Sequence, residues 1–281
     1  MIIDFHTHVF PSFFRERQYS VADESGFTSI YSSPKARVAG VKTLLDSMDK
    51  EGIHKSVIFG FPWDKNEHFK RHNDYVIEAV NRYPERLIGF ACFSPLASGG
   101  AGEAERCLRA GLSGVGELAF YSGGLSSRVF NALGEIMGIC REFDVPVLLH
   151  VNEPVGREYP GKIHNDLSEI YAFIKTYPLN RIILAHWGGG IFFYAVMKNE
   201  VKDVLRNVWF DTAASPFVYS PCVYRTAEEL VGPEKILFGS DFPLIKPQRY
   251  FEEMSSSGVS EQSLMKIKGL NAVELLGLEL Q

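Results

Sequence analysis

The chain has 281 residues, of which 46% are hydrophobic and 22% are charged. This composition is typical of a globular protein with enough apolar material for a core, and it argues against intrinsic disorder. The formal net charge of −5 disfavours a nucleic-acid partner, because neutralising a phosphate backbone requires clustered basic residues.

The cysteines and the N-terminal residues indicate the compartment. The four cysteines lie far apart without a C-x-x-C pair, which favours reduced core residues over a disulfide framework. No signal-peptide pattern and no uncharged apolar run of ~18 residues occurs. We therefore expect a cytoplasmic protein with a small-molecule substrate and no membrane partner. A homo-oligomer is left open.

Short apolar runs bounded by turn residues recur along the chain and alternate with longer segments of helical period. Near-continuous runs of Val, Ile, Leu and Phe are typical of strands that are buried on both faces of a parallel sheet. Eight such runs predict strands at Met1–His6, Lys55–Gly60, Arg86–Phe93, Gly114–Glu117, Val145–His150, Arg181–His186, Asn207–Asp211 and Lys235–Gly239.

Amphipathic helices are predicted between these strands. The pattern is clearest over His68–Arg82 and Val129–Phe143, where apolar residues recur at i, i+3 and i+4. Weaker patterns predict helices at Val41–Glu51, Gly102–Ala110, Leu167–Thr176, Phe192–Leu205, Thr226–Val231 and Gln262–Leu276.

Eight strands that alternate with helices favour a single (β/α)8 TIM barrel in the α/β class. A doubly wound sheet usually has fewer strands and a glycine-rich first turn, which this chain lacks. No repeat or flexible linker divides the chain, so we expect one domain over residues 1–281. Residues 9–40 after the first strand are far longer than an ordinary βα loop. This segment is either a substrate-covering insertion or a flexible surface insertion.

In such a barrel, functional residues collect at the carboxyl ends of the strands. The predicted strands end with residues that can bind a metal ion: His6, His8, Glu117, His150, His186 and Asp241. Residues two apart in an extended chain point to the same side, so His6 and His8 form a two-histidine clamp. Imidazole nitrogens and carboxylates suit Zn²⁺ and similar divalent ions. The sequence therefore predicts a metal centre at one mouth of the barrel.

Several motifs together resemble the metal-dependent amidohydrolase superfamily. They are Asp4-Phe5-His6-Thr7-His8, the strand-end His150, Ala185-His186-Trp187-Gly188-Gly189-Gly190, Gly239-Ser240-Asp241-Phe242-Pro243 and Asn271-Ala272. The chain is similar in particular to the branch that includes aminocarboxymuconate semialdehyde decarboxylase and related small hydrolases. The resemblance implies that His6, His8, His150 and Asp241 bind the metal. It implies that His186 is either a second-metal ligand or a catalytic group.

Glu117 departs from the pattern of the decarboxylases in this branch. Two-metal hydrolases of the superfamily place a carboxylate or a carboxylated lysine near this strand to bridge the ions. A buried carboxylate at a barrel mouth must be paired or coordinated, because an isolated one is too costly. Glu117 is therefore either a metal ligand or a partner that orients a histidine. This residue decides between one metal ion and two, and it favours hydrolysis.

The expected chemistry follows from the metal, with Zn²⁺ as the first expectation and Mn²⁺ or Fe²⁺ as alternatives. A bound Zn²⁺ lowers the pKa of its water to about 7. Asp241 would take the proton of that water and deliver it to the leaving group, and His186, unless it is a ligand, would polarise the attacked carbonyl. This predicts a metal-dependent hydrolase of a small amide, lactone or ester. The alternative is a metal-dependent lyase that decarboxylates or hydrates an unsaturated carboxylic acid.

Substrate-binding residues are predicted from their positions in loops. Trp63 follows the second strand, where it either forms an apolar wall of the site or packs in the core. Arg157, Tyr159 and Lys162 follow the fifth strand, where they either touch the substrate or belong to a solvated loop. Four other histidines are expected at the surface or in packing: His54, His68, His72 and His164.

Overall fold

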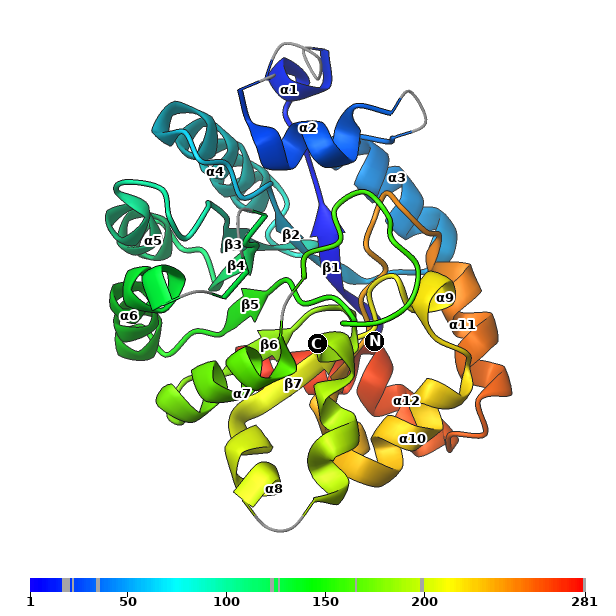
Figure 1. The fold of residues 1–281 in the computed structure, drawn as a ribbon. Helices are drawn as coiled ribbons and strands as arrows, with labels where there is room; N and C mark the ends of the chain where they lie inside the picture. The colour runs from blue at the N-terminus through cyan, green and yellow to red at the C-terminus, as the bar shows by residue number, and fades with distance from the viewer. Residues whose placement is uncertain are drawn as a thin grey trace.

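Eight parallel strands form the centre of the fold, and strands that are neighbours in the sequence are neighbours in the sheet (Figure 1). The protein is described by a computed structural model that covers residues 1–16, 21, 23–33, 36–121, 124–125, 127–164, 166–197 and 200–279. The strands are β1 (Ile3–His8), β2 (Lys55–Phe59), β3 (Leu87–Ala91), β4 (Gly114–Leu118), β5 (Val147–Leu149), β6 (Ile182–Leu184), β7 (Val208–Asp211) and β8 (Ile236–Leu237). A 2.7 Å hydrogen bond from the Phe5 amide to the Phe238 carbonyl joins the last strand to the first. The predicted TIM barrel is confirmed.

Helices follow the strands and cover the outside of the barrel (Figure 1). They include α3 (Val41–Glu51), α4 (Asn66–Arg82), α5 (Gly100–Arg109), α6 (Ser127–Glu142), α7 (Leu167–Thr176), α8 (Glu200–Val204), α9 (Ser215–Val218), α10 (Cys222–Val231), α11 (Pro247–Ser256), α12 (Glu261–Met265) and α13 (Asn271–Leu276). A π turn at Lys266–Leu270 interrupts the predicted closing helix between α12 and α13. Within the described residues, no helix is long and apolar enough to cross a membrane.

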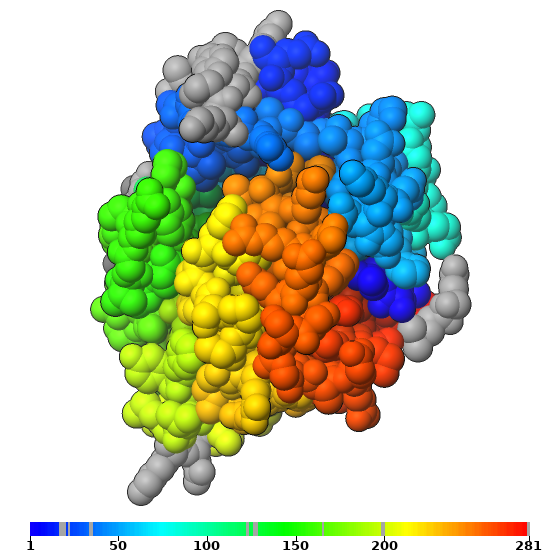
Figure 2. Space-filling view, turned by 90° about the vertical axis from the view of Figure 1, so that its right-hand side faces the viewer, coloured from blue at the N-terminus to red at the C-terminus, as the bar shows by residue number. Residues whose placement is uncertain are grey.

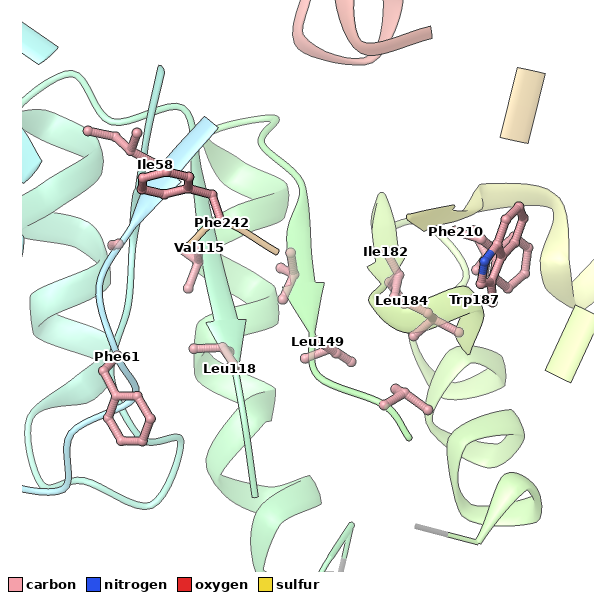
Figure 3. Close-up of a cluster of buried hydrophobic side chains, with 14 of the residues drawn as sticks. Ile58, Phe61, Val115, Leu118, Leu149, Ile182, Leu184, Trp187, Phe210 and Phe242 are labelled. Atoms are coloured by element: carbon pink, nitrogen blue, oxygen red, sulfur yellow. The ribbon is translucent and has the colours of Figure 1, made fainter. Parts of the chain in front are cut away.

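Alternating strand residues build two apolar layers. One face of the strands fills the barrel interior with Phe5, Val57, Phe59, Phe90 and Leu148. The other face packs against the helices with Ile58, Val115, Leu149, Ile182 and Leu184 (Figure 3). Because both faces are apolar, the polar residues that a site requires are left to the strand ends, where the interior packing stops.

The predicted helix over Phe192–Leu205 is wrong. After β6 the chain forms η1, a 3₁₀ segment over His186–Val196, and the short helix α8 follows separately. Gly188, Gly189 and Gly190 have φ values of 58°, 61° and 89°, a left-handed backbone that favours glycine. A Cβ at Gly189 would lie 2.4 Å from the Asn152 carbonyl oxygen, so the glycine run also permits a close approach of two loops.

The segment of residues 9–40 contains α1 (Ser12–Glu16) and α2 (Ser25–Tyr31), and its residues 17–20, 22 and 34–35 lie outside the described structure. Figure 2 shows its blue residues at one end of the molecule, beside the lighter blue α3 and the orange α11. Glu24, directly before α2, is 2% exposed. Its carboxylate accepts hydrogen bonds from the amides of Asp64 (3.0 Å) and Lys65 (3.1 Å), and lies 2.7 Å from His68 Nδ1. Glu24 thus caps the start of α4 from a distant part of the chain.

Removal of the Glu24 carboxylate is expected to destabilise the fold. In Glu24→Ala, two amides and an imidazole lose their acceptor in a buried place, which should lower the free energy of unfolding by roughly 1–3 kcal/mol. Urea unfolding measures the change. The matched control is Asp166→Ala, which removes the exposed cap of α7 and should cost about 1 kcal/mol or less. A loss in Glu24→Ala no larger than in the control would contradict this role.

Candidate metal centre

Five of the predicted strand-end side chains meet at one mouth of the barrel. His6 Nε2 lies 3.7 Å from a Glu117 carboxylate oxygen and 3.7 Å from an Asp241 carboxylate oxygen. His8 Nε2 lies 3.6 Å from Glu117 and 3.7 Å from Asp241. His186 Nε2 lies 3.4 Å from Glu117. Groups from β1, β4, the turn after β6 and the turn after β8 therefore share one small volume.

Two of these residues reach the centre through an unusual backbone. His186 has a φ of 54° and Asp241 a φ of 58°, in the left-handed region that residues other than glycine seldom adopt. Each lies just after a strand, where the chain turns sharply. Strained backbone of this kind persists where surrounding packing enforces it, and it is common at functional sites.

The side chains form two groups with the composition of a metal site. His6, Glu117 and His186 have ligand atoms within 4.8 Å of one another, and so do His6, His8 and Asp241. The Nε2 atom of His6 is buried without a hydrogen-bond partner. A buried nitrogen without a partner is costly, so its lone pair fits a cation held between the surrounding donors.

A surrounding layer of acceptors fixes the tautomers of the histidines. Nδ1 of His6 lies 2.8 Å from an Asp211 carboxylate oxygen, Nδ1 of His8 lies 2.9 Å from the Gly60 carbonyl, and Nδ1 of His186 lies 3.1 Å from the Ala213 carbonyl. In the neutral form of each ring, Nδ1 therefore carries the proton and donates it outward. The Nε2 lone pair of that form faces the centre, as in metal sites whose ligands are oriented from behind.

His150 is placed differently from the other histidines. Its Nδ1 lies 2.8 Å from a Glu117 oxygen, and its Nε2 lies 2.8 Å from Asn152 Oδ1. It belongs to neither group of three, although it lies 3.2 Å from His186 Nε2. In this arrangement His150 orients Glu117, and its role as a metal ligand stays a prediction.

Mutual attraction sets the charges in this cluster. Burial opposes ionisation of Glu117, but His150 and His6 hold the pKa of its carboxyl well below the usual value. Burial likewise opposes protonation of His6 and His186, yet the carboxylates of Asp211 and Glu117 raise the pKa of His6 to about 10, and Glu117 raises the pKa of His186 to about 9. Protons thus balance the carboxylates at neutral pH. A divalent cation would balance the same charges and displace those protons.

Two acids in this region escaped the sequence reasoning. Asp211 ends β7, and its second oxygen accepts the His186 amide at 3.0 Å. Asp4 accepts the amide of Ser240 at 2.8 Å and is also bonded by the Ser240 hydroxyl, and burial raises the pKa of Asp4 to about 7. The sequence does carry a signal for Asp211, because it is a carboxylate at the end of a strand, as are the candidate ligands.

A cavity of about 810 Å³ extends outward from the centre. Its floor contains His8, Glu117, His150, His186 and Asp241. Its walls carry aromatic and basic residues from several loops: Tyr31, Arg37, Phe61, Tyr121, Arg157, Tyr159 and Phe217. The cavity can therefore hold a flat organic acid next to the cluster.

The predicted substrate residues divide between the cavity and the core. Arg157 and Tyr159 line the cavity. Trp63 is fully buried, stacks on Phe14 at 4.4 Å between ring centroids, and donates its indole N–H to His72. Of the two interpretations of Trp63, the structure agrees with packing in the core and not with a wall of the site. Of the other histidines, His54 and His68 make hydrogen bonds away from the cluster, and His164 lies at the surface.

Comparison with known proteins decides the family. The amidohydrolase family model matches residues 3–278. The chain belongs to the amidohydrolase family. The predicted resemblance to this superfamily is confirmed, and its match extends from β1 to the end of the chain's last helix.

Several proteins to which this amidohydrolase is similar are decarboxylases. Gamma-resorcylate decarboxylase of Rhodococcus jostii is 25% identical in an alignment that covers 75% of this chain and 76% of that protein. The structure of 5-carboxyvanillate decarboxylase from Sphingomonas paucimobilis superposes with a TM-score of 0.79 at 17% identity and covers 99% of both chains. A dihydroxybenzoic acid decarboxylase from a Polaromonas species, with bound manganese and the inhibitor 2-nitroresorcinol, has a TM-score of 0.72 at 19% identity and covers 100% of this chain and 98% of that chain.

The similarity to these proteins corrects the function that was predicted from the sequence. The prediction of a hydrolase for a small amide, lactone or ester is wrong, because the relatives are lyases that act on carboxylic acids. The alternative of a decarboxylating lyase agrees with them. Glu117 favoured hydrolysis in the sequence, because two-metal hydrolases of the superfamily place a bridging carboxylate near this strand. In the structure this carboxylate lies 2.8 Å from His150 Nδ1 and within 3.7 Å of three further histidines.

Asp211 is expected to control metal affinity through His6. In Asp211→Asn, an amide N–H₂ can face His6 Nδ1, which favours the tautomer with the proton on Nε2 and blocks its lone pair. Affinity for Mn²⁺ should fall by roughly 10–100-fold, measured by titration calorimetry on chelator-treated protein. Glu103→Gln, a change of another buried carboxylate on α5, is the control and should leave the affinity unchanged. Equal affinities in Asp211→Asn and the wild type would refute this role.

Proposed function

We propose that this amidohydrolase is a metal-dependent lyase that removes CO₂ from a small aromatic hydroxy acid. The observation that carries the proposal is the cavity, which joins a cluster of metal donors to walls with aromatic rings and two arginines. Aromatic walls suit a flat ring, and guanidinium groups suit a carboxylate. The similarity to gamma-resorcylate decarboxylase supports the same substrate class.

We propose that one divalent ion binds here, with His6, His8, Glu117, His186 and Asp241 as the candidate donors. Both groups of donors depend on His6. Its Nδ1 is engaged by Asp211, and Nε2 has a single lone pair, so His6 can serve only one ion at a time. Manganese is the first ion to test, because related structures contain it. The histidine and carboxylate donors also suit zinc and iron.

The reaction breaks the bond between the ring carbon and the carboxylate, and CO₂ leaves. The electron pair of that bond stays on the ring carbon, which must then take a proton. When bound, the metal supplies positive charge that draws electron density toward the substrate's oxygens. We assign the proton transfer to Asp241, because it reaches both the donor cluster and the cavity, with a side chain 16% exposed. His186 lines the same floor, and its Nε2 has one of two roles: it binds the ion, or it carries a proton and holds the substrate's carboxylate.

Two irregular segments are proposed to enclose the substrate. Ile30, Tyr31, Ala36 and Arg37 bring the 9–40 segment to the cavity wall. The loop after β5 supplies an adjoining part of the wall, including Arg157 and Tyr159. On this proposal the 9–40 segment is a substrate-covering insertion rather than a flexible surface insertion.

The reconstituted protein is expected to release CO₂ from hydroxybenzoates. Chelator-treated protein would be loaded with Mn²⁺ and given a panel of dihydroxybenzoates and a carboxyvanillate, with CO₂ and the phenol measured by mass spectrometry. In D₂O the product should carry one deuterium at the carbon that lost the carboxylate. The control panel contains a lactone, an ester and an amide. Turnover of the control panel without CO₂ release, or full activity without metal, would exclude the proposal.

Asp241→Asn is expected to abolish turnover without unfolding the chain. Loss of the proton donor should lower kcat by a factor on the order of 10²–10⁴ at saturating Mn²⁺, while the melting temperature stays near that of the wild type. Asp46→Asn, at an exposed acid on α3, is the control. An active Asp241→Asn variant would remove the catalytic assignment, and an unfolded one would show a structural role instead.

A further inference from the structure

The loop between β5 and α7 forms much of one cavity wall. Figure 1 shows this green loop crossing the barrel mouth between α2 and α9. Eight of its residues line the cavity, and Arg157 and Tyr159 are among them. Most of them are without regular secondary structure, so something other than a helix or strand ladder must hold their shape.

The two ends of this loop are held together by side chains. Asn152 Oδ1 accepts a 2.8 Å hydrogen bond from the Ile163 amide. One residue further in, the Lys162 ammonium lies 3.2 Å from a Glu153 carboxylate oxygen. Residues 152–163 therefore form a closed Ω-loop, whose ends meet and whose middle faces the cavity.

Lys162 lies inside this loop rather than in solvent. Its side chain is 1% exposed, whereas that of Lys175 on α7 is 58% exposed. The ammonium donates to the carbonyls of Val155 at 3.2 Å and Arg157 at 3.3 Å, in addition to Glu153. Its three donors thus match two carbonyls and a carboxylate. A buried ammonium that satisfies loop carbonyls fixes the path of the backbone between them.

The same loop is joined to the metal centre and to α2. Asn152 contacts His150 Nε2 at 2.8 Å and donates to the Tyr159 hydroxyl at 3.0 Å. Gly161, with a φ of 89°, lies so close to α2 that a Cβ there would be 2.9 Å from the Ile30 side chain. The position of the loop therefore affects the cavity floor, its wall and its contact with the 9–40 segment.

We propose that Lys162 is a positioning residue that sets substrate fit. Its ammonium holds the Ω-loop of residues 152–163 in the shape that brings Arg157 and Tyr159 to the cavity, without touching the substrate itself. The inference rests on the proposed function only in taking this cavity as the substrate site.

The test replaces the ammonium by an apolar group of similar length in Lys162→Met. With whichever acid the wild type decarboxylates, KM should rise about ten-fold and kcat should change less than about three-fold, because the wall moves while the reacting groups stay. Amide hydrogen exchange of residues 154–161 should become faster in the substrate-free protein. Bound manganese per chain should be unchanged.

Lys175→Met is the matched control, since it removes an exposed lysine paired with Glu200 on the outer surface. It should leave KM and the exchange of the loop unaltered. Glu153→Gln removes the carboxylate that pairs with Lys162 and should change both quantities in the same direction as Lys162→Met. If Lys162→Met does not fold, KM and hydrogen exchange of Glu153→Gln test the same proposal.

The outcomes separate this inference from the proposed function. If the wild type decarboxylates no acid, the proposed function fails, and hydrogen exchange of residues 154–161 still tests the loop, with and without manganese and 2-nitroresorcinol. Unchanged exchange in both Lys162→Met and Glu153→Gln would overturn the positioning role. An unchanged KM together with faster exchange would overturn the claim that this loop sets substrate fit.

Discussion

A carboxylate taken out of water must be compensated where it lies, and Glu117 is the group around which this centre is built. It is 2% exposed, and nitrogens of His6, His8, His150 and His186 lie within 3.7 Å of its oxygens. No element could supply four imidazoles by itself. They come from the ends of β1, β5 and β6, so compensation of one buried anion depends on barrel closure.

The next requirement is that the histidine rings turn Nε2 toward the centre. Asp211 orients two of these residues: one carboxylate oxygen accepts from His6 Nδ1, and the other accepts from the backbone amide of His186. The end of β7 thus couples β1 to the turn after β6. The carbonyls of Gly60 and Ala213 orient the rings of His8 and His186. The order of the centre is therefore determined one layer behind the groups that face the cavity.

The sequence was sufficient for the barrel because burial on both faces leaves a local signal, a run of apolar residues, at each strand. It was also sufficient to expect the five strand-end side chains that meet at the mouth, because the barrel places strand ends together, but it missed Asp211 at the end of β7. The bond between His6 and Asp211 spans 205 positions and leaves no period in the sequence. The burial of Trp63 depends on Phe14 and Phe27 of the 9–40 segment, which has no regular pattern. The helix predicted over Phe192–Leu205 failed because the preceding glycine run takes a left-handed path.

Metal donors of this kind are compatible with both hydrolysis and decarboxylation. The donors alone therefore do not identify the reaction. Hydrolysis needs a water molecule at the ion, whereas the proposed reaction needs a proton delivered to carbon and no competing water. The difference must then lie in the walls. They include α2 and the loop of residues 152–163, which meet at Ile30 and Gly161. A closed wall excludes water and strengthens every electrostatic contact inside it. On the proposed function, the strand ends supply the metal donors, and the irregular segments of the wall determine which reaction takes place there.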